Sequence, residues 1–136
     1  MAKVNRSPKT WDQLIVLGDF LAVCDGNDVR LPEDQFYYEL QLQLVPRDIS
    51  LEIIKRQMKN KAISIIKNNY PYTRTLKYLP DVTQYCLWSI KGRLGERQIE
   101  KQASKKFKSK KWFYFERGTG KKSVPELWHC HIFVKG

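Results

Sequence analysis

The chain has 136 residues, of which 42% are hydrophobic and 12% aromatic, and its formal net charge is +11. This size and composition are typical of one globular domain with its own core, so we expect residues 1–136 to form a single domain. No apolar run is long enough to span a bilayer, and the first residues lack the pattern of a secretion signal, so we expect neither a membrane partner nor secretion. Three separated cysteines predict neither a disulfide framework nor a four-ligand zinc site.

The positive charge is concentrated in the last third of the chain. Residues 91–136 contain 13 Lys and Arg against four Asp and Glu, whereas residues 1–90 are nearly balanced. Such a basic region suits a polyanion, and nucleic acid is the commonest one. The alternative for the run KKFKSKK is a solvated loop that only aids solubility. We predict a nucleic-acid-binding surface built from lysines, namely Lys105, Lys106, Lys108, Lys110, Lys111, Lys121 and Lys122.

The first half of the chain predicts two helices with a strand between them. Thr10 is a candidate N-cap for a helix that Asp25 and Gly26 end, with a strand at LIVL as the alternative. The segment FYYELQLQLV alternates apolar and polar residues, which predicts a half-exposed strand. In SLEIIKRQMKNKAISIIKNN, apolar residues recur every three or four positions, which predicts a helix around Ile54–Ile65.

The second half ends in a predicted hairpin. After a loop or short strand at PYTRTLKYLPD, a helix is expected from Asp81 through VTQYCLWSIKG to about Ala103, weakened by Gly92 and Gly95. KKFKSKK is then a basic connector, and the strands WFYFER and LWHCHIFV pair across an exposed loop. These elements predict an α+β fold, in which an antiparallel central sheet with FYYELQLQLV, WFYFER and LWHCHIFV as neighbours is flanked by helices.

The last strand carries two histidines separated by one residue. Side chains alternate along a strand, so His129 and His131 lie on one face while Cys130 and Ile132 lie on the core face. Two adjacent imidazoles on an exposed face form a rigid platform for a divalent cation. Glu116, near the end of the preceding strand, is the candidate third ligand, and such a set suits Mg²⁺ or Mn²⁺. The alternative is that both histidines are ordinary polar residues on a wet face.

The order of strand, glutamate, glycine-containing charged loop and WHCHIFVKG resembles the metal-site hairpin of HUH endonucleases, above all the second replication motif of parvovirus nonstructural replication proteins. The resemblance covers Trp112–Gly136 and is architectural upstream; initiators of plasmids and single-stranded DNA viruses have a similar order. It implies an HUH/Rep-like sandwich in which Glu116, His129 and His131 bind the metal.

The resemblance also implies an activity and partners. The activity is metal-dependent, site-specific nicking of single-stranded DNA, with origin binding, in rolling-circle or rolling-hairpin replication. The implied partners are single-stranded or origin DNA and further copies of the chain, in the host nucleus if the protein is viral and otherwise in the cytoplasm.

The nucleophile is where the chain departs from that pattern. HUH initiators use a tyrosine oxygen to attack the phosphodiester, usually from a helix after the histidine strand, whereas all seven tyrosines here precede it. The chain is then a fragment of a longer replication protein, a permuted relative, or a domain that binds DNA without cleaving it. Tyr37 and Tyr85 are the internal candidates. A non-catalytic basic nucleic-acid-binding module is therefore the second hypothesis, with Phe107 and Trp112 stacking on bases, and an unrelated α+β protein is the third.

Overall fold

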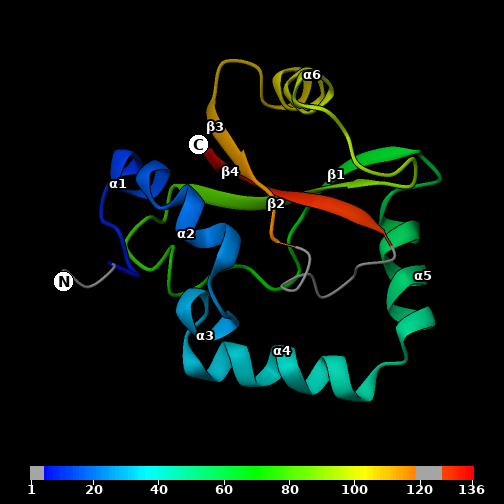
Figure 1. Cartoon of the computed structure of the whole chain (residues 1–136), viewed down its shortest axis with the longest axis horizontal. Helices are drawn as coiled ribbons and strands as arrows, with labels where there is room; N and C mark the ends of the chain where they lie inside the picture. Colours follow the sequence, from blue (N-terminus) through cyan, green and yellow to red (C-terminus); the bar gives the residue numbers. More distant parts are fainter. Residues whose placement is uncertain (1–4, 119–126) are drawn as a thin grey trace.

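A computed structural model describes residues 5–118 and 127–136 of the chain. An antiparallel sheet of four strands lies at its centre, in the order β1-β2-β4-β3, and helices lie on both sides of the sheet (Figure 1). The predicted α+β fold with a helix-flanked antiparallel sheet is confirmed. No helix in the described parts of the chain is long and apolar enough to cross a membrane. The strands are β1 (Ile63–Lys67), β2 (Val82–Ser89), β3 (Lys111–Phe115) and β4 (Trp128–Lys135).

The N-terminal helix forms where it is predicted but in two pieces, α1 (Trp11–Val16) and α2 (Gly18–Val23). Thr10 caps the first, because its side-chain oxygen accepts a hydrogen bond from the backbone N–H of Gln13 at 3.2 Å. The break falls at Leu17, directly before a glycine, the residue with the lowest helix propensity apart from proline. A short helix, α3 (Gly26–Val29), follows.

The predicted strand FYYELQLQLV is wrong, because Pro32–Leu44 form the helix α4. Pro32 occupies the first turn, where its missing N–H costs nothing, and Glu33 and Asp34 follow at the positive end of the helix dipole. The rest of the helix is rich in Leu, Gln and Glu, which favour helices, and it contains no β-branched residue. Alternation of leucine and glutamine therefore did not indicate a two-faced strand.

The helix predicted around Ile54–Ile65 is correct only in its first part. Helix α5 (Arg47–Gln57) ends at Met58, and the next two residues, Lys59 and Asn60, have φ angles of 53° and 62°. This left-handed backbone cannot continue a right-handed helix. The isoleucine-rich segment beyond it becomes the edge strand β1, paired with β2.

The helix predicted from Asp81 is also wrong over its first half. Residues Val82–Ser89 form β2, which pairs with β1 on one side and β4 on the other. Its β-branched and aromatic residues fit a pleated strand. Helix α6 begins only after Gly95, at Glu96–Phe107, so the predicted basic connector is mostly the end of α6 and the turn into β3.

The β3–β4 hairpin is confirmed, with Phe115 opposite His131. Helix α6 covers one face of the sheet, where Phe107 packs in a cluster with Cys130 and Ile132, so the predicted core face is confirmed. Helices α1 to α5 lie on the other side (Figure 1). Phe133 packs there with side chains of α1 and α2, and the expected exposed second face is therefore wrong.

Arg117, two residues after β3, fastens α2 to the sheet. Its guanidinium donates to the carbonyl oxygen of Leu21 at 2.5 Å and to that of Cys24 at 2.6 Å, while the side chain is buried. Carbonyls at a helix C-terminus have no partner within the helix, and a charged donor satisfies them strongly. The clamp joins the first helices to the last hairpin.

Replacing Arg117 by Met should lower the free energy of unfolding by about 3 kcal/mol, because two buried carbonyls lose their donors. Chemical denaturation measures the change. The control is Lys111→Met at the exposed start of β3, which should alter stability by less than about 0.5 kcal/mol. Equal stabilities of the two variants would show that the clamp is dispensable.

Candidate functional site

His129 and His131 lie side by side on β4, with ring centroids 5.3 Å apart, so their predicted shared face is confirmed. They are buried, with exposed fractions of 5% and 6%. The ring of His129 stacks on Trp88 with centroids 4.2 Å apart, and that of His131 stacks on Phe115 at 5.1 Å. The imidazoles are therefore held between aromatic rings, and substitution by alanine would leave a cavity in the core.

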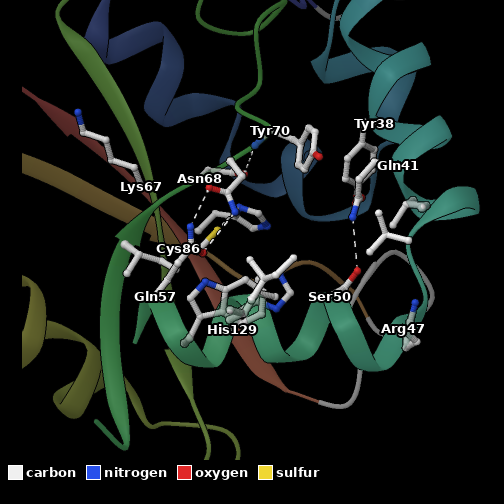
Figure 2. A pocket seen from close by; sticks show the side chains of 18 of the residues that line it. Tyr38, Gln41, Arg47, Ser50, Gln57, Lys67, Asn68, Tyr70, Cys86 and His129 are labelled. Atoms are coloured by element: carbon white, nitrogen blue, oxygen red, sulfur yellow. Dashed lines mark hydrogen bonds between the residues drawn. The ribbon is translucent and has the colours of Figure 1, made fainter. Parts of the chain in front are cut away.

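Both histidines line a cavity of about 270 Å³ between the sheet and the helices α4 and α5. Figure 2 shows Cys86 and His129 on the sheet side of this space and Tyr38, Gln41 and Ser50 on the helix side. None of the lining residues in the described parts of the chain is Asp or Glu, whereas three are cations. The cavity therefore suits an anionic ligand. The three cations are Arg30, Arg47 and Lys67.

A hydrogen-bond network from β2 holds His131. The side-chain nitrogen of Gln84 lies 3.1 Å from Nδ1 of His131, and Sγ of Cys86 lies 3.7 Å from the same atom. The backbone N–H of Tyr72 donates to Oε1 of Gln84 at 2.7 Å, which fixes the amide. Burial, and then the neighbouring His129, lower the pKa of His131 well below its ordinary value. His131 is therefore neutral at neutral pH.

Glu116 is not brought to the histidines. Its Oε1 accepts a hydrogen bond from the indole N–H of Trp128 at 2.9 Å, and its Oε2 pairs with Nε of Arg93 at 3.1 Å. Trp128 packs in the cluster on the α6 side of the sheet. The described residues contain no group of three or more His, Cys, Asp and Glu that could hold a metal ion. His129 and His131 alone bring at most two ring nitrogens to a cation, and the expected carboxylate does not complete their site.

The tyrosines that line the cavity are not the two that the sequence analysis named as candidates. Tyr37 lies on α4 with 58% of its surface exposed, and Tyr85 packs on Phe107 on the α6 side of the sheet. Tyr38 and Tyr70 line the cavity, as Figure 2 shows. Neither of the tyrosines chosen from the sequence is among the described residues that line it.

The predicted lysine surface is separate from the cavity. The five lysines within the described residues are exposed and lie at the end of α6, in the following turn and at the start of β3. Helix α6 covers the face of the sheet opposite the histidines (Figure 1). Lys121 and Lys122 lie outside the described residues. The described lysines are Lys105, Lys106, Lys108, Lys110 and Lys111.

Sequence reasoning missed the polar residues around the histidines, above all Arg30 and Gln84. Arg30 is buried, donates from Nε to the carbonyl oxygen of Tyr70 at 3.0 Å, and lies over the ring of Tyr38 at 3.9 Å. The sequence offered no signal for it. Gln84 offered one, because a lone amide within the apolar run VTQYCLW must find buried hydrogen-bond partners.

Comparisons with known proteins bear on the fold alone. No protein-family model matches the chain, and no curated protein resembles it at a significant level. A solved structure described as the crystal structure of HTC1 is similar, with a TM-score of 0.58 and 14% sequence identity. The match covers 93% of this chain and 84% of that one. It therefore supports the α+β architecture over nearly the whole chain.

The buried His131 should make the protein less stable as the pH is lowered. Its folded-state pKa lies below the unfolded value near 6.5, so the unfolded chain binds a proton that the folded chain resists. The free energy of unfolding should hold above about pH 6.5 and decline below it, by up to about 1.4 kcal/mol per pH unit. Denaturation at several pH values down to about 5 measures this. The variant His131→Gln should show a smaller decline, and an unchanged decline would contradict the assignment.

Proposed function

We propose that this chain is the DNA-binding and nicking domain of an HUH-type replication initiator, acting on single-stranded DNA at an origin in rolling-circle or rolling-hairpin replication. The observation that carries the proposal is the pair of imidazoles of His129 and His131 on a central strand, lining a cavity with cationic residues and, among its described lining, no carboxylate. A phosphodiester is the anion that such a cavity suits. The hairpin resemblance adds the reaction type.

A divalent cation, Mg²⁺ or Mn²⁺, at His129 and His131 is part of this proposal. When bound, such a cation stabilises negative charge on a phosphate oxygen. The low pKa of His131 favours this role, because only a neutral imidazole can bind a metal. Glu116 is left out of the proposed ligands, since its carboxylate contacts Trp128 and Arg93.

The cavity also changes which tyrosines should be tested as the nucleophile. Tyr38 and Tyr70 line it, and their rings lie 5.1 Å apart between centroids. Tyr72 contacts His131, but it is buried and its burial raises its pKa, which opposes formation of the attacking phenolate. Tyr38 and Tyr70 are therefore the internal candidates that the geometry favours over Tyr37 and Tyr85.

A second candidate function is DNA binding without cleavage. Two observations favour it: Glu116 faces away from the histidines, and the described residues hold no three-ligand metal group. In this case the lysines at the end of α6 would bind phosphates, and the cavity would bind DNA without reaction. Metal binding and strand cleavage separate the two candidates.

The nicking proposal predicts that the protein binds Mn²⁺ and cleaves single-stranded oligonucleotides of mixed sequence in its presence. The double variant His129→Gln, His131→Gln should lose both properties, whereas Glu116→Gln should keep Mn²⁺ binding within about twofold because its carboxylate is not a proposed ligand. Electron paramagnetic resonance measures bound Mn²⁺, and gel electrophoresis measures cleavage.

Glutamine replaces histidine in that test because it preserves much of the volume between Trp88 and Phe115. A wild-type protein that binds DNA but neither binds Mn²⁺ nor cleaves would reject nicking by this chain and leave the second candidate. Loss of Mn²⁺ in Glu116→Gln would show that the carboxylate does reach the histidines.

The basic surface predicts salt-dependent DNA affinity. Binding of a short single-stranded oligonucleotide should weaken steeply between about 50 and 200 mM salt, because each phosphate contact releases counterions. Replacing Lys105, Lys106 and Lys108 by Ala should reduce the slope of log affinity against log salt by roughly 2. Fluorescence anisotropy measures both effects.

The matched control replaces three exposed lysines elsewhere, Lys9, Lys77 and Lys91, and so removes the same net charge. This control should change the slope much less. Equal effects in the two triple variants would mean that net charge, and not the end of α6, determines binding.

A further inference from the structure

Gln84 stands between a fixed backbone donor and one of the two cavity histidines. It is 3% exposed, and its Oε1 accepts a hydrogen bond from the backbone N–H of Tyr72 at 2.7 Å. Its Nε2 lies 3.1 Å from Nδ1 of His131. Turning the amide over would place its NH₂ group against the N–H of Tyr72, so that two buried donors would face each other. The backbone therefore decides which end of the amide meets the histidine.

This orientation determines where the hydrogen of the imidazole lies. An amide NH₂ group can only donate, so Nδ1 of His131 must accept. A neutral imidazole carries one hydrogen, which is then on Nε2. Cys86, whose Sγ is 3.7 Å from Nδ1, can add a weak S–H donor to the same atom.

We propose that Gln84 is a positioning residue that holds His131 as a hydrogen-bond donor through Nε2–H, so that the cavity without a bound metal ion takes a phosphate oxygen of single-stranded DNA. The metal side of this inference rests on the proposed function, whereas the tautomer rests on the buried contacts alone. The donor adds to the three cations that line the cavity, Arg30, Arg47 and Lys67.

The same contact opposes a cation at His131. A histidine that binds a metal through Nε2 must carry its hydrogen on Nδ1, and in proteins that hydrogen is usually donated to a carboxylate or a carbonyl oxygen. Gln84 presents a donor where such an acceptor is needed. Cation binding through Nε2 therefore requires the hydrogen to move to Nδ1 and the amide to give up its bond to Tyr72. A phosphate oxygen bound directly by Nε2–H and a cation bound directly to Nε2 thus require opposite tautomers of His131, and the proposed cation site requires the second of these.

The substitution Gln84→Glu tests this directly, because a carboxylate accepts from both Tyr72 and His131. It should move the hydrogen of His131 to Nδ1, raise Mn²⁺ affinity roughly tenfold, and weaken binding of inorganic phosphate and of a single-stranded oligonucleotide. The matched control is Gln57→Glu, which adds the same charge to the cavity lining at an exposed residue that hydrogen-bonds Asn69. This control should leave the tautomer unchanged.

The tautomer is read from long-range ¹H–¹⁵N spectra of the metal-free protein, in which protonated and unprotonated ring nitrogens have well-separated ¹⁵N shifts. The chain has two histidines, and His131→Gln assigns their signals. If Gln84→Glu does not fold, Gln84→Met removes both hydrogen bonds and should give a mixture of tautomers.

The outcomes are distinguishable. A wild-type spectrum with the hydrogen of His131 on Nδ1 overturns the inference, whatever the protein does to DNA. An equal rise in Mn²⁺ affinity in Gln57→Glu also overturns it, because charge alone would then explain the effect. If the tautomer changes as expected but neither wild type nor Gln84→Glu binds Mn²⁺, the positioning role stands and the proposed metal chemistry fails.

Discussion

The rest of the structure depends on the burial of β4 on both of its faces. The strand lies between β2 and β3 in the sheet, with α6 on one side and the N-terminal helices on the other. A polar side chain on such a strand loses water and must find hydrogen bonds or ring contacts within the protein. The neutrality of His131, its contact with Gln84 and the stacking of His129 on Trp88 all follow from this position.

The elements that the sequence predicted correctly are those in which residue type and pattern agree. WFYFER and LWHCHIFV combine aromatic and branched residues with a hairpin order, and both form strands. In FYYELQLQLV the alternation suggested a strand while leucine, glutamine and glutamate favoured a helix, and composition prevailed. VTQYCLWS shows the opposite case, in which the pattern did not indicate a strand although the β-branched and aromatic residues favour one. The segment forms a strand that is buried on both faces, and such a strand shows no clean alternation.

The candidate site was predictable only within one strand. The i, i+2 spacing placed His129 and His131 on one face, because alternation is a local property. The position of Glu116 depends on which residues of β3 and β4 face each other, and a long connection does not fix that register. Most of the residues that line the cavity around the histidines come from α4, α5, β1 and β2, of which three were assigned wholly or partly to the wrong element. These residues come together only in the tertiary structure, and local patterns in a single sequence do not predict that.

The Arg117 clamp has a consequence for how the chain acquires its shape during synthesis. It joins residues separated by 96 and 93 positions, and β2 pairs with a strand that begins at Trp128. Contacts of this range cannot form until Arg117 and β4 have left the ribosome, and they slow folding because a long loop must close. Until then α4 and α5 lack the complete sheet that they cover, and their leucines and isoleucines are more open to chaperones or to other nascent chains. The histidine cavity therefore cannot exist before β4 has been synthesised.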